Sequence, residues 1–223
     1  MAHRKQGYRF ENDWTLERLE TRTFQSVKEA ITVPVDVEIE GEHLVLNLDN
    51  VKQILGKART ISIMDCNCRV ERGHCDAPVN VCMDMNEIAE RNIANGIARE
   101  ITLDEALGVL EKTHEAGLVH MGLGQGEFYE PGVIKSVCSC CSCCCTVLSG
   151  ILRFGLAPHL LQSQAVSVTD TSACTACGDC VDRCQFGAKE MVNGSLAHNP
   201  DLCFGCGLCV STCPTKAITL VDK

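Results

Sequence analysis

Two copies of one cysteine spacing near the C-terminus constrain this chain more than any other feature. In each copy the cysteines are separated by two, two and three residues, and the second copy begins 29 residues after the first. The surrounding residues repeat at the same offset, since Cys177-Gly178 corresponds to Cys206-Gly207. Two copies of a unit of this length predict a domain with pseudo-twofold symmetry. The eight cysteines are Cys174, Cys177, Cys180, Cys184, Cys203, Cys206, Cys209 and Cys213.

This spacing suits iron–sulfur chemistry. A [4Fe–4S] cluster needs four thiolates from tetrahedral directions, and three closely spaced cysteines in a tight loop can hold three of its corners. The fourth cysteine of each copy lies too far along the chain to complete the same cube, so we expect it to bind the cluster of the other half. A pair of zinc sites is the alternative, but zinc favours paired C-x2-C knuckles. The rule assigns to cluster I Cys174, Cys177, Cys180 and Cys213, and to cluster II Cys203, Cys206, Cys209 and Cys184.

With these two motifs, residues 164–223 resemble the bacterial-type ferredoxins that hold two [4Fe–4S] clusters. The resemblance implies a ferredoxin-like fold for this part of the chain, clusters of low potential, and one-electron exchange with a partner redox enzyme in an anaerobe. One position departs from the family pattern. Gln185 follows the fourth cysteine of the first copy, where the family usually has proline, whereas Pro214 is present in the second copy. The departure bears on local rigidity rather than on ligation.

The composition limits the other classes of function. The chain has 223 residues, 18 cysteines and a formal net charge of −9, which argues against a nucleic-acid binder. Residues 1–10 lack the apolar core of a signal peptide. The apolar stretch at 147–161 is interrupted by Arg153 and His159 and is too short to span a bilayer. We therefore expect a soluble cytoplasmic protein without membrane insertion, in which metal rather than disulfide bonding accounts for the thiols.

Ten further cysteines form two knots in the preceding region. The first knot has enough thiols for one cluster, and the six cysteines within eight residues of the second cannot all reach one cube, because neighbouring side chains of an extended chain point to opposite faces. One or two further [4Fe–4S] clusters are expected, each drawing on one knot or on both. The alternatives are a zinc site in the first knot, with or without His74 as a ligand, and a substrate-contacting cluster in the second knot. The knots are Cys66, Cys68, Cys75 and Cys82, and then Cys138, Cys140, Cys141, Cys143, Cys144 and Cys145.

This front region also resembles a less-characterised family of ferredoxin-fused proteins from anaerobes. The shared features are Cys66-Asn-Cys68-Arg69, the turn Gly117-Leu118-Val119-His120, and the dense cysteine run at 138–145. The resemblance brings no established activity with it. It therefore supports a cysteine-rich iron–sulfur domain in front of the ferredoxin-like one, and nothing finer.

The predicted fold class is α+β, in three parts. Residues 1–60 form an N-terminal arm with a β-hairpin over 33–47 and a short helix over 50–58. Residues 61–163 form a mixed, mainly helical cysteine-rich domain, with a strand at 61–64 and helices over 83–96, 102–117 and 147–161. The second of these helices opens with a capping box at Thr102. Gly122, Gly124 and Gly126 are interpreted as a flexible loop. Residues 164–223 form the ferredoxin-like domain.

These patterns predict an electron-transfer protein rather than an enzyme. Single electrons would pass through the [4Fe–4S] clusters to or from a partner oxidoreductase, with the chain acting as a subunit or a dedicated carrier in anaerobic metabolism. Three alternatives stay open at this point. One is a catalytic reductase subunit with a substrate-contacting cluster in the run at 138–145. The second is a redox sensor whose cluster is lost reversibly on oxidation. The third is a zinc-stabilised docking module fused to a ferredoxin.

Overall fold

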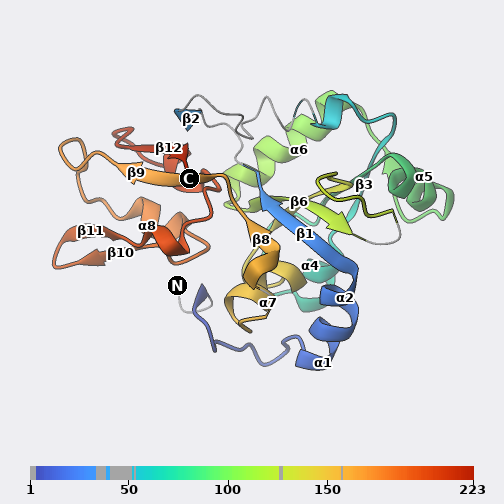
Figure 1. The fold of residues 1–223 in the computed structure, drawn as a ribbon, viewed down its shortest axis with the longest axis horizontal. Coiled ribbons are helices and arrows are strands. Elements are labelled where there is room, and N and C mark those ends of the chain that lie inside the picture. Colours follow the sequence, from blue (N-terminus) through green and yellow to red (C-terminus); the bar gives the residue numbers. More distant parts are fainter. Residues whose placement is uncertain (1–3, 34–38, 41–51, 53, 126–127, 157) are drawn as a thin grey trace.

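The computed structural model describes residues 4–33, 39–40, 52, 54–125, 128–156 and 158–223. A larger body is built round a seven-stranded sheet, and a smaller body, orange to red in Figure 1, holds the C-terminal residues. The chain is therefore a mixed α and β structure, with the repeated cysteine motifs gathered in the smaller body.

The seven strands run in the order β5-β3-β4-β7-β6-β1-β8. Every neighbouring pair is antiparallel except β1 with β8, which is parallel. Strand β1 comes from the N-terminal segment and lies between β6 and β8, so residues 27–32 belong to the same sheet as the cysteine-rich segment. The strands are β1 (Val27–Thr32), β3 (Ile61–Asp65), β4 (Asn80–Met85), β5 (Arg99–Glu100), β6 (Val119–Gln125), β7 (Ser136–Cys140) and β8 (Leu161–Gln162).

The helices of the larger body confirm some predicted positions and correct others. Helix α6 (Leu103–Glu115) begins as predicted, because the Thr102 hydroxyl oxygen accepts a hydrogen bond from the amide of Glu105. The helix predicted over 83–96 is α5 (Asn86–Ala94) and begins later, because Met83 and Met85 fill the buried face of strand β4.

The helix predicted over 147–161 is also shorter. Helix α7 spans Thr146–Leu152, and the amide of Leu156 then bonds to the carbonyl of Gly150 while Gly155 takes a φ of +70°, which closes the helix. A 3₁₀ turn at Pro158–Leu160 leads into β8. The remaining helices are α1 (Leu16–Arg18), a π-helical turn at Leu19–Thr23, α2 (Phe24–Ser26) and α4 (Asn67–Arg72).

Two other predictions concern segments next to the sheet. The glycines expected in a loop lie partly in β6, where a Cβ on Gly122 would come within 2.6 Å of the Ile134 side chain and one on Gly124 within 2.9 Å of Tyr129. Close packing therefore explains these glycines. The hairpin predicted over 33–47 falls largely outside the described residues. In the short helix predicted over 50–58, residues 52 and 54–56 are helical.

The C-terminal body contains two strand–helix–strand units. Strands β9 and β12 pair antiparallel, β10 and β11 form a hairpin, and β2 (Ile39–Glu40) adds a short parallel edge to β12. A 29-residue offset relates three pairs of residues with positive φ, namely Ala176 and Gly205, Gly178 and Gly207, and Gly187 and Lys216. The elements are β9 (Ala165–Thr169), α8 (Asp179–Arg183), β10 (Lys189–Val192), β11 (Ser195–His198), a 3₁₀ turn at Pro200–Leu202, α9 (Leu208–Ser211) and β12 (Ile218–Asp222).

Two arginines join the bodies at the ends of helices. Arg4 donates to the carbonyl oxygens of Val181 and Cys184, at 2.8 and 2.6 Å, where α8 ends. In the other direction, Arg183 donates to the carbonyl oxygens of His114 and Glu115, each at 2.9 Å, where α6 ends. Cations at these positions add hydrogen bonds to the carbonyls at the helix ends and complement the helix dipole. The two bodies are thus tied together at both helix ends.

Candidate iron–sulfur centres

One cavity of the C-terminal body is lined by thiols from both halves of the repeat. Leu196 and Ile218 close it on the apolar side. Cys177 is exposed and Cys174 and Cys213 are half-buried, so this cavity lies near the surface. No three of the eight C-terminal thiols lie within 4.8 Å of one another in the part of the chain that the structure describes. The four thiols of this cavity are those of Cys174, Cys177, Cys180 and Cys213.

A second cavity is lined by the other four thiols, and it is more deeply buried. Phe186, Phe204 and Leu208 surround it, and the side chain of Lys189, a residue that is only 3% exposed, reaches it as well. Burial raises the pKa of Cys209 to about 12, so the unliganded thiol is held protonated. The thiols are those of Cys184, Cys203, Cys206 and Cys209.

Backbone amides point at sulfur in this second cavity. The amide of Ala188 donates to Sγ of Cys184 at 3.3 Å, and the amide of Ser167 donates to Sγ of Cys203 at 3.4 Å. Such donors stabilise a thiolate and the negative charge of a thiolate-bound cluster. The donor set therefore fits a [4Fe–4S] cluster: four thiols round one space, amide donors to sulfur, and an apolar wall. The ligation of iron by these cysteines stays a prediction.

Comparison with known families decides what this body is. Residues 167–190 and 196–219 each match the model of the 4Fe-4S binding domain. The C-terminal quarter is a 4Fe–4S ferredoxin domain. The two matched segments coincide with the two copies of the cysteine spacing, so the resemblance to ferredoxins is confirmed for this part of the chain.

Curated relatives of the ferredoxin domain come from methanogens. An uncharacterized ferredoxin of Methanocaldococcus jannaschii is 42% identical over 48 residues, which is 22% of this chain and 29% of the relative. The pyruvate synthase subunit PorD of the same organism is 38% identical over 57 residues, 25% of this chain and 66% of the relative. The polyferredoxin protein MvhB of Methanothermobacter marburgensis is 32% identical over 84 residues, 31% of this chain and 20% of the relative. The chain thus spans less than two thirds of each.

The ten cysteines in front of the ferredoxin domain fall into two groups, and each group takes members from both sequence knots. Antiparallel pairing of β4 with β7, in which Met83 lies opposite Val137, sets Cys82 beside Cys138. Cys138 and Cys140 point to one face of β7, because side chains two residues apart in a strand share a face. The first group is a ring of six interacting thiols, Cys66, Cys68, Cys145, Cys140, Cys138 and Cys82.

The six-thiol ring lines a cavity of about 410 Å³. Trp14 and Arg18 from the N-terminal segment also line it, as do Asp84 and Thr146. The pKa of Cys138 is lowered to about 7 by hydrogen bonds from Cys140 and Cys82, against the effect of its burial. A thiol of this kind ionises near neutral pH, which prepares it for binding a metal.

The second group is a compact quartet, Cys75 with Cys141, Cys143 and Cys144, whose four Sγ atoms all lie within 4.8 Å of one another. His74 lies next to it, but Nδ1 faces the carbonyl oxygen of Cys143 at 3.0 Å and Nε2 faces that of Asn12 at 2.8 Å. Both ring nitrogens are therefore directed at backbone oxygens rather than at the thiols.

Several residues that support these sites carry no motif. Arg153 is fully buried, pairs with Asp13, and donates to the carbonyl oxygens of Ser142 and Cys143 at 2.9 and 3.0 Å. It thereby holds the turn between β7 and α7. The only signal for it in the sequence is a single charge inside an apolar stretch.

Gln185 joins the ferredoxin domain to the same turn. Its Oε1 accepts from the hydroxyl of Ser142 at 2.7 Å, and its Nε2 donates to the carbonyl oxygen of Gly117 at 3.0 Å. Proline at this position could make neither bond. The departure from the ferredoxin pattern therefore has a structural role, since it ties Cys184 to the front region.

Proposed function

We propose that this chain is an electron-transfer protein whose ferredoxin domain binds two [4Fe–4S] clusters. The observation that carries the proposal is the pair of cavities lined by four thiols each, in which three come from one half of the repeat and the fourth from the other. Cluster I would be held by Cys174, Cys177, Cys180 and Cys213, and cluster II by Cys184, Cys203, Cys206 and Cys209. When bound, each cluster would take up and release one electron at a time.

The burial of the two cavities suggests the order of the sites. Cys177 is exposed, so the first site lies where a partner can approach it. In contrast, Cys184, Cys203 and Cys206 belong to the same buried core as Cys140 and Cys145 of the front region. The second site therefore stands between the surface site and the six-thiol ring. The repeated φ values of the two halves support the pseudo-twofold symmetry that the cysteine spacing predicts.

We further propose that the six-thiol ring binds one additional iron–sulfur cluster. Six thiols exceed the four that a cubane needs, and their cavity also has side chains of the N-terminal segment in its wall. This observation favours, as a second candidate function, a reductase in which the cluster of the ring contacts a small substrate. That second function would be supported if Cys68→Ser abolished substrate reduction and left the clusters of the ferredoxin domain in place.

The partner is proposed to be an oxidoreductase with a basic docking face. The chain carries a formal charge of −9, and anionic clusters would add to its negative field, so association should weaken with salt. The pyruvate synthase subunit among the relatives makes a role as a subunit of such a complex a natural proposal for this chain. Among the described residues, no helix is long and apolar enough to cross a membrane. A cytoplasmic location stays a prediction.

The test is to measure iron and acid-labile sulfide per chain on protein purified without oxygen. We expect about 12 irons and about 12 acid-labile sulfides per chain, from two clusters in the ferredoxin domain and one in the ring. Cys206→Ser should remove the signal of one ferredoxin-domain cluster in electron paramagnetic resonance and leave the other, whereas the exposed Val192→Ser is the matched control and should leave both. Protein without sulfide would refute the proposal, and about 8 irons would restrict it to the ferredoxin domain.

A further inference from the structure

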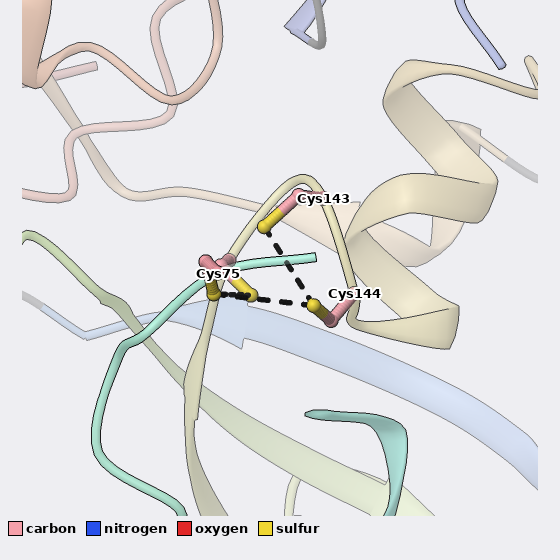
Figure 2. Close-up of side chains that lie close together, drawn as sticks. Cys75, Cys143 and Cys144 are labelled. Carbon is pink, nitrogen blue, oxygen red and sulfur yellow. Dashed lines mark hydrogen bonds between the residues drawn. The ribbon is translucent and has the colours of Figure 1, made fainter. Parts of the chain in front are cut away.

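The compact quartet is assembled from two distant segments of the chain. Cys75 follows helix α4, and the other three thiols come from the turn between β7 and α7. Figure 2 shows the side chains of Cys75, Cys143 and Cys144 with their sulfurs close together. The Sγ of Cys75 lies 3.8 Å from that of Cys141 and 3.9 Å from that of Cys144, and the Sγ of Cys143 lies 3.7 Å from that of Cys144.

The size of this group distinguishes between two kinds of metal centre. A tetrahedral ion with metal–sulfur bonds of about 2.3 Å places its four sulfurs about 3.8 Å apart. A [4Fe–4S] cluster carries one thiolate on each of four irons, so its thiolate sulfurs lie roughly 6 Å apart. The three sulfur–sulfur distances given above agree with the spacing expected round a single tetrahedral ion. In the described residues no other set of three such ligand atoms is drawn together within 4.8 Å, the eight thiols of the ferredoxin domain included.

The surroundings of the quartet are those of a closed site. The three thiols that come from the turn between β7 and α7 are buried and pack against Leu118 and Phe10. Four thiolates round a divalent ion carry a net charge of −2, and buried charge needs compensation. Arg69, which is 2% exposed, places Nη2 at 3.6 Å from Sγ of Cys141. Arg153 is fully buried and bonds to the carbonyl of Cys143, while its own charge is paired with Asp13.

Hydrogen bonds to its carbonyl oxygens fix the backbone of the turn between β7 and α7. The indole Nε1 of Trp14 donates to the carbonyl oxygen of Cys144 at 2.8 Å. Together with the Arg153 bonds, this contact holds the thiols in position through groups that do not touch the metal, as is usual for the shell round a metal site. All four ligand positions are filled by protein, which is typical of structural rather than catalytic ions.

We propose that Cys75, Cys141, Cys143 and Cys144 bind a single tetrahedral ion, Zn²⁺ or Fe²⁺, that is separate from every iron–sulfur cluster. The ion clamps the segment after α4 to the turn before α7. Because Ser142 of that turn bonds to Gln185, the clamp also fixes the face on which the ferredoxin domain rests. The proposal does not depend on the electron-transfer function.

The experiment measures zinc, iron and acid-labile sulfide on the full chain purified without oxygen, together with two variants. The wild type should hold one zinc per chain, or one iron in excess of sulfide. Cys75→Ser should lose that single ion and keep its sulfide. The matched control is Cys82→Ser, which lies in the six-thiol ring and should keep the ion whatever it does to the cluster. Loss of about four irons and four sulfides in Cys75→Ser would overturn the proposal, because the quartet would then hold a cubane.

X-ray absorption on the wild type tests the site even if Cys75→Ser fails to fold. For a zinc-loaded chain, the zinc edge should report four sulfurs at about 2.3 Å without a neighbouring iron. For an iron-loaded chain, oxidation should produce the magnetic signature of one isolated high-spin ferric ion. Nitrogen or oxygen ligands to the ion, or neither zinc nor excess iron, would overturn the proposal. The absence of clusters from the ferredoxin domain would be detected separately, as a low sulfide content of the wild type, because the single ion brings no sulfide.

Discussion

Lys189 places a positive charge beside the proposed cluster II, and its removal should lower the reduction potential of that cluster. The residue is buried at a position where the second copy of the repeat has Ile218. Its Nζ donates to the hydroxyl of Thr169 at 3.3 Å, and its charge acts on the thiols of Cys180 and Cys209. Reduction adds a negative charge to the cluster, so a nearby ammonium stabilises the reduced form.

The size of the effect follows from Coulomb's law. A unit charge about 6 Å from the added electron, at an effective dielectric constant of about 20, contributes about 3 kcal/mol. For transfer of one electron this corresponds to about 120 mV. Lys189→Met keeps the length of the side chain and removes the charge, so the potential of cluster II should fall by about this amount. The matched control is Lys216→Met at an exposed lysine, where water and salt should limit the shift to about 20 mV.

The assay is a redox titration followed by electron paramagnetic resonance, or voltammetry of the adsorbed protein, on the wild type and both variants. The expected result in Lys189→Met is a fall in the potential of cluster II, whose cavity Lys189 lines, and a smaller fall in that of cluster I, because the same charge also acts on Cys180. Equal shifts in the two variants, or a rise in potential, would refute the assignment of Lys189 as an electrostatic neighbour of cluster II.

Three further substitutions test the packing round the sites. In Gly205→Ala the added Cβ would clash with the carbonyl oxygen of Ala165, so the variant should destabilise the ferredoxin domain by about 2–3 kcal/mol. Ala176→Gly relaxes a φ of +54° and should not destabilise the domain. Anaerobic denaturation followed by cluster absorbance compares the two variants. Asp13→Ala leaves the buried Arg153 without its carboxylate and should lower the free energy of unfolding by about 3–5 kcal/mol. The fluorescence of the single tryptophan gives the unfolding midpoint, and a change below about 1 kcal/mol would contradict the pairing. Gln185→Ala removes the hydrogen bonds to Ser142 and Gly117 and should lower the stability of this contact by about 1–3 kcal/mol. Amide hydrogen exchange should become faster in residues 141–145 and stay unchanged in β10–β11.

The ferredoxin domain could be predicted from the sequence because its information is local. Three of the four thiols of each proposed cluster lie within seven residues, and the spacing alone limits what they can surround. Helix α6 could be predicted for the same reason, since its capping box lies within four residues. In both cases the deciding contacts are between neighbours in the chain.

The front region could not be predicted in this way, because its sites depend on strand pairing. Cys75 reaches the turn at 141–144 only through the arrangement of α4 against the sheet, and the ring of six depends on the register of β4 with β7. A shift of one residue in that register would turn Cys138 and Cys140 to the other face and regroup the thiols. Likewise, the alternation of Met83 and Met85 in a strand is hard to distinguish from helical spacing over so few residues.

Gln185 shows how a small departure from a family pattern can carry information about domain arrangement. A ferredoxin domain that works alone has no need of a polar side chain directed outward beside its fourth cysteine, and proline serves there by stiffening the loop. In this chain the same position faces Ser142, which lies between two members of the compact quartet. The residue next to a ligand of the proposed cluster II therefore contacts the residue between two ligands of the proposed single-ion site. An ion that fixes the turn would fix this contact as well, and so would hold the ferredoxin domain at a set position relative to the six-thiol ring. A structural ion would in this way support electron transfer by holding the two parts of the chain in place.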